Sequence, residues 1–148
     1  MNKEKFMLRT IASIFGAIMV IVGILGFFPM FAPGGHLLGI FHVDTLHNII
    51  HIVTGVVALA CGLCKRCNMC CGNGEKKNRP VNREECPHAA RTFFQVFGIV
   101  YGIVALLGFY YGNAPILGIL ANNIADAWLH TVIALFSLYL GFIYKENY

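Results

Sequence analysis

The sequence predicts an all-α, polytopic membrane protein with four transmembrane helices, built from two tandem, parallel two-helix repeats. Of its 148 residues, 57% are hydrophobic and only 12% are charged. Soluble domains average about 25% charged residues. Because so few charges cannot cover a core of this size with water-facing side chains, we expect the protein to lie in a lipid bilayer.

Four apolar segments lead to this prediction, and they run over roughly residues 10–31, 46–64, 92–113 and 124–143. Each is close to the length of about 20 residues that crosses a bilayer as a helix. A membrane-spanning strand would alternate apolar and polar residues, whereas these segments are apolar on every side. We therefore expect each segment to be a helix.

The chain contains an internal repeat. The stretch RTIASIFGAIMVIVGILGFF from Arg9 resembles RTFFQVFGIVYGIVALLGFY from Arg91, with Arg-Thr, Phe-Gly, Ile-Val and Leu-Gly-Phe in register. Likewise, LGIFHVDTLHNIIHIVTGVVALACG from Leu38 resembles LGILANNIADAWLHTVIALFSLYLG from Leu117. A tandem duplication of a two-helix hairpin explains both matches. Since each copy has an even number of spans, the copies would be parallel, with a pseudo-two-fold axis along the membrane normal.

The repeat also predicts the domain organisation. Residues 1–148 would form a single four-helix membrane domain. Repeat 1 would cover about residues 9–64 and repeat 2 about residues 91–143, with a Cys-rich, basic loop over residues 65–90 between them.

The basic residues predict the orientation in the membrane. All eleven lie in the N-terminus, the middle loop or the C-terminus: Lys3, Lys5, Arg9, Lys65, Arg66, Lys76, Lys77, Arg79, Arg83, Arg91 and Lys145. Loops rich in Lys and Arg stay on the cytoplasmic side of a membrane. We therefore expect both termini and the middle loop to be cytoplasmic, and the two short loops to face outward.

Two polar pairs lie at the outer ends of the second and fourth predicted helices. The repeat aligns His47 and His51 of HNIIH with Asp126 and His130 of DAWLH. Residues four apart share one face of a helix. Ionisable side chains in membrane helices are costly and need partners. Below these pairs, both faces carry small residues that allow close approach, so we expect the two faces to lie against each other.

Three hypotheses for these four side chains stay open at this point. In the first, they form a hydrogen-bonded cluster that only locks the helices together, with Asp126 accepting from a histidine. In the second, His47, His51, Asp126 and His130 bind a divalent metal, because three His and one Asp suit Zn²⁺, and suit Fe²⁺, Ni²⁺ or Cu²⁺ less selectively. In the third, His51 and His130 are the axial ligands of a haem.

Residues of the outer loop complete this region. Asp44 directly precedes the second predicted helix and is expected to be its N-cap. His36 and His42 have no counterpart in the second repeat, and we interpret them as loop residues.

A second candidate metal site begins at the end of the second predicted helix and continues in the middle loop. Cys64, Cys67 and Cys70 follow one another at intervals of three residues, and Cys86 and His88 come later. C-x2-C with C-x-H is a zinc pattern, and C-x2-C-x2-C with a later C-P is an iron–sulfur pattern, although the spacing fits neither class well. Free thiols or acylated cysteines are the alternatives.

Several of these motifs together resemble a known family. LLGIFHVDTLHNIIHIVTG, ARTFFQVFGIVYGIVALLGF and NIADAWLH are similar to the domain of unknown function 4383 family, over nearly the whole chain. The resemblance implies a small four-helix membrane protein of bacteria or archaea, located in the inner membrane. It implies no activity.

The sequence favours a binding or structural role over catalysis. It contains no nucleophile triad, phosphate-binding loop or dinucleotide fingerprint, so we expect no enzyme activity. The expected partners are the lipid bilayer and either a second copy of the chain or another membrane protein, but not nucleic acid. The expected cofactor is zinc or another divalent transition metal. The alternatives are a structural or partner-binding subunit and, third, a haem-bearing redox protein.

Overall fold

The computed structural model describes residues 7–63 and 88–144. The described chain is mostly helical, and four of its helices are long and apolar enough to cross a membrane, as predicted. The elements in order are α1 (Met7–Leu25), η1 (Pro33–Gly35), β1 (His36–Leu37), β2 (Phe41–His42), α2 (Thr45–Leu63), α3 (His88–Tyr111), α4 (Ile124–Leu138) and the π-helical turn η2 (Tyr139–Ile143).

Two helix boundaries differ from the prediction. The first helix ends at Leu25 rather than near residue 31, because Gly26 and Pro29 follow. Glycine is costly within a helix, and proline disfavours helical conformation in the residue before it. The third helix begins at His88, so the last residues of the predicted loop over 65–90 are already helical.

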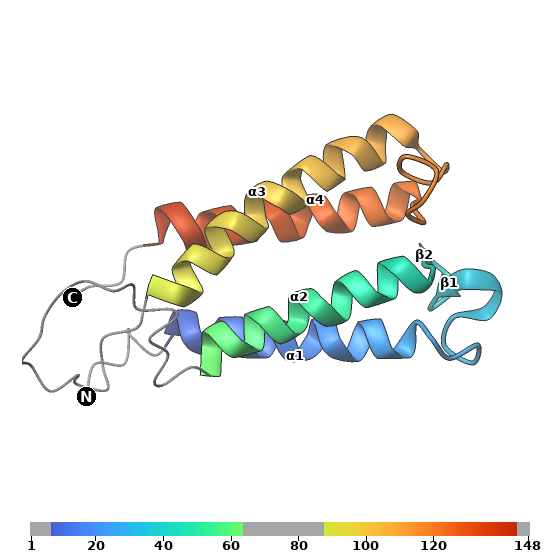
Figure 1. Ribbon diagram of the computed structural model, residues 1–148. Helices are drawn as coiled ribbons and strands as arrows, with labels where there is room; N and C mark the ends of the chain where they lie inside the picture. The colour runs from blue at the N-terminus through green and yellow to red at the C-terminus, as the bar shows by residue number, and fades with distance from the viewer. Residues whose placement is uncertain (1–6, 64–87, 145–148) are drawn as a thin grey trace, which may run out of the picture.

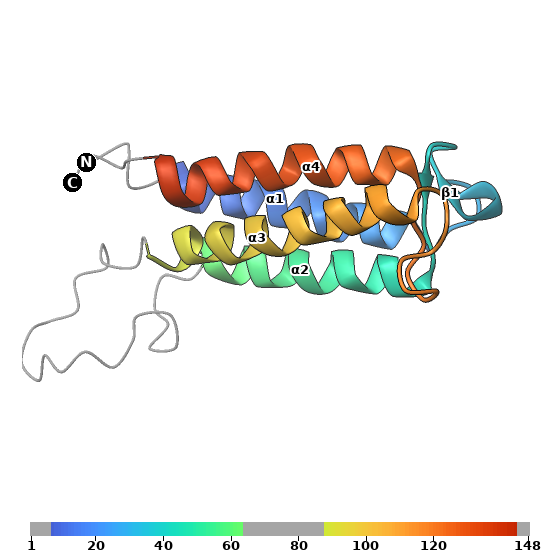
Figure 2. The same cartoon turned by 90° about the horizontal axis from the view of Figure 1, so that it is seen from above.

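The helices form two antiparallel hairpins, α1 with α2 and α3 with α4 (Figure 1). Seen from above, α3 lies between α1 and α2, so the second hairpin packs on the first mainly through α3 (Figure 2). The described chain ends meet at one end of the bundle, where the Tyr144 hydroxyl donates to the Met7 sulfur at 3.5 Å. The two short turns lie at the opposite end.

Glycines hold the helices of each hairpin close together. A Cβ added at Gly55 of α2 would lie 2.7 Å from the Gly16 carbonyl oxygen of α1. A Cβ at Gly62 would meet the Arg9 carbonyl oxygen at the same distance, and one at Gly141 would lie 2.8 Å from Gln95 N of α3. Small residues permit such contacts between membrane helices. The small faces of α2 and α4 were predicted to lie against each other. Between the histidines and the chain-end side of the bundle this prediction is wrong, because these faces pack within each hairpin.

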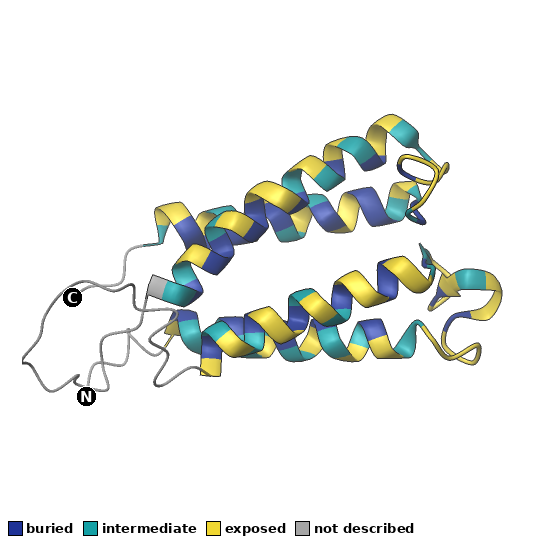
Figure 3. Cartoon of the chain, in the orientation of Figure 1, coloured by how far each residue is buried: buried dark blue, intermediate teal, exposed yellow. Residues whose placement is uncertain are grey.

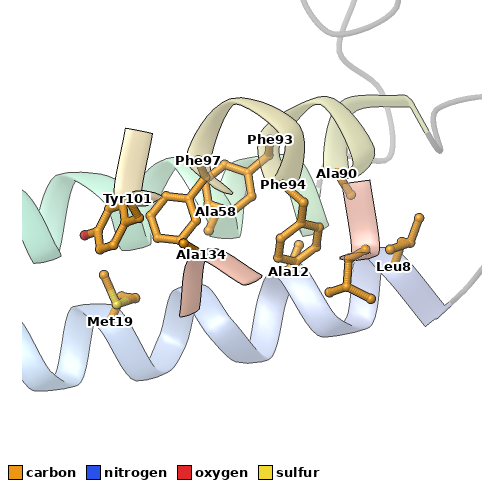
Figure 4. Packing of buried hydrophobic residues seen from close by; sticks show 11 residues of the cluster. Leu8, Ala12, Met19, Ala58, Ala90, Phe93, Phe94, Phe97, Tyr101 and Ala134 are labelled. Carbon is orange, nitrogen blue, oxygen red and sulfur yellow. The ribbon is translucent and has the colours of Figure 1, made fainter. Parts of the chain in front are cut away.

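Aromatic side chains of α3 fill the space between the hairpins. Phe93, Phe94, Phe97 and Tyr101 are buried, and Figure 4 shows them packed among the small side chains of Ala12, Ala58 and Ala134 from the other three helices. The ring of Phe15 on α1 lies 5.1 Å from that of Phe97, centroid to centroid, in an edge-on arrangement. Large side chains on one helix thus pack against alanines on the others.

The outward faces of the helices are apolar. Figure 3 shows exposed residues along the outside of every helix. On α1 they include Ile14, Ile18 and Ile21, each more than half exposed. A continuous apolar surface of this extent is unfavourable in water and suits contact with lipid. The protein is therefore a multipass membrane protein whose helices contact the bilayer.

The two turns at the far end share one backbone conformation. Leu38 and Leu117 have φ values of 54° and 53°, and the glycines that follow them, Gly39 and Gly118, have 74° and 75°. Positive φ at both central residues defines a type I′ turn, which glycine adopts readily and leucine rarely. The strand pair Leu37 with Phe41 in the first turn matches the bridge Ile116 with Leu120 in the second. This likeness agrees with the predicted duplication.

Candidate functional site

The two helices that carry the histidines each begin at a capping side chain, a carboxylate on α2 and an amide on α4. Asp44 is the N-cap of α2, as predicted, because its Oδ1 accepts from the backbone N–H of His47 at 2.7 Å. Asn123 is the N-cap of α4 and forms a capping box with Asp126. Each cap fixes the first turn of its helix, where His47 and Asp126 lie.

The same carboxylates join the two hairpins. The second oxygen of Asp44, Oδ2, accepts from the backbone N–H of Ala121 at 2.7 Å, and Ala121 belongs to the other hairpin. In return, Asp126 Oδ2 accepts from the backbone N–H of His42 at 3.1 Å. The Asn123 side chain also donates to the Ile40 carbonyl at 2.7 Å. These bonds set α2 and α4 at a fixed distance where the histidines face each other.

Replacing Asp44 with alanine is expected to destabilise the protein by about 2 kcal/mol, because it removes an N-cap and leaves Ala121 N–H without an acceptor. Unfolding in detergent, followed by circular dichroism, measures this loss. Asp44→Asn keeps one acceptor oxygen and should cost clearly less. Equal stability of Asp44→Ala and the natural protein would contradict the role of this carboxylate.

Three histidines from two helices converge at this end of the bundle. His47 and His51 of α2 and His130 of α4 are all buried, and one potential ligand atom from each lies within 4.8 Å of the others. The Nε2 atoms of His47 and His51 are 3.1 Å apart. The ring centroids of His47 and His130 are 6.0 Å apart. The structure thus brings together three of the four residues that the sequence singled out.

A backbone carbonyl orients His47. Its Nδ1 lies 3.2 Å from the Ala121 oxygen, which accepts only, so Nδ1 carries the proton and donates. In the neutral ring, Nε2 then carries a lone pair, which accepts from the Nε2–H of His51 at 3.1 Å. Metal-bound histidines commonly donate their other N–H to such a carbonyl, which fixes the tautomer. Sequence reasoning missed Ala121, because the side chain carries no signal of what its backbone contacts.

Asp126 lies outside the group of three ligand atoms. Its Oδ2 accepts from the backbone N–H groups of His42 and Asn123, at 3.1 and 3.0 Å. The aspartate in the second polar pair thus serves in helix capping and hairpin joining, whereas its aligned residue, His47, points into the histidine group.

His130 contacts Tyr101, another residue that sequence reasoning missed. The two rings are 5.2 Å apart and perpendicular. Among the described residues, Nδ1 of His130 has no hydrogen-bond partner although it is buried. Phe93, Phe97 and Tyr101 recur every four residues, so the spacing would have placed Tyr101 on the inner face of α3.

The remaining site predictions fall elsewhere. Cys64, Cys67, Cys70 and Cys86 lie outside the described residues, as does the side chain of His88. The rings of His36 and His42 stack at 5.1 Å on the first outer turn. The backbone N–H of His42 donates to Asp126, and neither the His36 nor the His42 ring belongs to the group of three ligand atoms.

Four apolar helices joined at one end by paired carboxylates define a multipass membrane protein with a buried polar group near one membrane surface. The chain belongs to the domain of unknown function 4383 (DUF4383) family, whose sequence model matches residues 9–67 and 84–143. No curated protein and no solved structure matches the chain.

Proposed function

We propose that the protein binds one divalent transition-metal ion, with zinc the preferred ion, through His47, His51 and His130. The observation that carries this proposal is the convergence of three buried imidazoles from two helices, with ligand atoms within 4.8 Å of one another. Following the distribution of basic residues, we further propose that this site faces the outer side of the inner membrane and that both termini are cytoplasmic.

The spacing suits a zinc ion. Nitrogen ligands bound tetrahedrally at about 2.0–2.1 Å lie roughly 3.3 Å apart. The 3.1 Å between the Nε2 atoms of His47 and His51 already approaches this value. The His130 ligand atom lies within 4.8 Å of the other two, so its ring must move closer to them to complete the site. An ion would also give the buried imidazole of His130 a partner, since its Nδ1 has none among the described residues.

The geometry favours a single ion over a haem. A porphyrin held by His51 and His130 must pass between these two rings. His47 Nε2 lies only 3.1 Å from His51 Nε2 and occupies the space next to the proposed axial ligand.

A structural role is the second candidate, supported by the hydrogen bonds that join the two hairpins. Those bonds use Asp44, Asp126 and Asn123 as side-chain partners. A hydrogen bond between the Nε2 atoms of His47 and His51 also links His51, through His47, to the Ala121 carbonyl of the other hairpin. A purely structural role therefore leaves one buried histidine, His130, unexplained.

Elemental analysis of the detergent-purified protein, combined with competition against a chromogenic chelator, tests the proposal. We expect about one zinc per chain at the histidine site. Because the middle-loop cysteines could also hold metal, the measurement is repeated after all six cysteines are replaced by serine. Loss of all bound metal in that variant would contradict the proposal, and a Soret absorption band would establish haem instead.

The role of Asp126 is tested separately. Asp126→Asn keeps an oxygen that can accept from both backbone N–H groups but removes the negative charge. With three histidines as the ligands, we expect the zinc affinity to fall by less than about tenfold, the lower end of the range for outer-shell residues. A fall of more than a hundredfold would show that the carboxylate is a fourth ligand.

A further inference from the structure

An apolar groove runs from the three histidines along the seam between α2 and α3. It has a volume of about 470 Å³, which is within the range of small-molecule sites. Tyr101, Phe97 and Phe93 are its buried aromatic residues. Its edges are valines of the two helices, Val53 and Val57 on α2 and Val96 and Val100 on α3. All three histidines also line it, so the metal site and the groove form one continuous space.

The groove opens toward lipid. Its four edge valines are between 47% and 57% exposed, and they belong to membrane-spanning helices. On α2 the lining extends from His47 to Val57. At 1.5 Å per residue this distance is about 15 Å, which is half of the roughly 30 Å hydrocarbon thickness of a bilayer. The groove therefore has about the length that one acyl chain spans in one leaflet.

The histidine end determines the head group. Three protein ligands leave one position of a tetrahedral zinc ion for an outside ligand. Three neutral imidazoles bring no negative charge onto the ion, because the group of ligand atoms includes no carboxylate. An anionic oxygen ligand satisfies both requirements.

From these observations we infer that the groove and the metal site together bind a long-chain fatty acid, with its acyl chain between α2 and α3 and its carboxylate on the metal ion. This inference rests on the proposed metal site for the head group, whereas the position of the chain rests on the groove alone. The protein would then be a membrane receptor or carrier for a free fatty acid.

Binding of radiolabelled palmitate to the zinc-loaded, detergent-purified protein tests the inference, with methyl palmitate as the comparison. The ester has the same chain but no anionic oxygen. Because contacts with a charged group are about twice as strong as neutral ones, we expect palmitate to bind at least about tenfold more tightly. Equal binding of the acid and the ester would overturn the assignment of the head group.

A matched pair of variants tests the position of the chain. Val100→Trp fills the groove at a residue that is not one of the proposed metal ligands, and we expect it to weaken palmitate binding by about tenfold or more. Val132→Trp places the same side chain on the exposed face of α4, where Val132 is 62% exposed and outside the groove. It should bind palmitate normally.

Zinc content, measured on the same samples, separates the two proposals. Both tryptophan variants should keep their zinc. Zinc binding with equal palmitate affinity in the two variants would overturn the fatty-acid site alone. Absence of zinc from the natural protein would overturn the metal site, and with it the carboxylate ligand.

Discussion

Replacing both His51 and His130 with alanine is expected to lower the zinc affinity by more than about a hundredfold. Even outer-shell partners of a metal ligand contribute 10- to 100-fold, and this change removes two of the three ligands themselves. One nitrogen, from His47, would be left for the ion. The dissociation constant, measured by competition with a chromogenic chelator in detergent, gives the result directly.

The outer turn provides a matched control for this experiment. His36→Ala with His42→Ala also removes two histidines, and their stacked rings lie on the first outer turn. We expect zinc binding to be unchanged, because neither ring belongs to the group of three ligand atoms. An equal loss of affinity in both double variants would show that the zinc is bound nonspecifically by histidines. A second double variant, His51→Gln with His130→Gln, keeps polar side chains at both positions. It shows whether zinc is lost because the ligands are gone or because the protein no longer folds.

The second large effect is expected at the contact between the two helices of the first hairpin. A Cβ at Gly55 would lie 2.7 Å from the Gly16 carbonyl oxygen and 2.8 Å from Val20 N. Both neighbours are backbone atoms of α1, so no side-chain rotation relieves the overlap. Gly55→Val should therefore cost at least about 3 kcal/mol, the upper part of the usual range for overpacking. Loss of a monodisperse, thermally stable species in detergent measures it.

Gly102 on α3 is the corresponding control. A Cβ there would lie 4.0 Å from the Ala134 Cβ, an ordinary van der Waals contact. Gly102→Ala should be neutral or stabilising by up to about 1 kcal/mol, because alanine favours helix more than glycine does. If the two substitutions had equal effects, close helix approach at Gly55 would not be what holds the hairpin together.

Much of the fold is predictable from composition and periodicity. The four apolar segments correspond to the four spanning helices because bilayer thickness sets both helix length and the need for apolar side chains. Asp44 was recognisable as a helix start because capping depends on neighbouring residues only. The tandem duplication stays a prediction, and the two matching Leu-Gly turns agree with it.

Contacts between helices were not predictable in the same way. Small faces on α2 and α4 indicate close packing, but every helix of this protein carries small residues. The sequence therefore did not show which faces pair. In the structure, Gly55 packs on Gly16 and Gly141 packs on Gln95, within each hairpin. The aromatic side chains of α3 occupy the space between the hairpins. They keep α2 and α4 apart in the half of the bundle that lies toward the chain ends.

The sequence by itself determined that this is a membrane protein, that it has four spanning helices, and which polar residues are candidates for the site. These properties depend on local composition and on i, i+4 spacing. Only the tertiary structure decided how those residues divide their roles. His47, His51 and His130 converge, whereas Asp126 accepts backbone hydrogen bonds at the helix start. The groove beside them likewise exists only where α2 and α3 meet. Convergence and grooves depend on how separate helices cross, and no stretch of one helix contains that information.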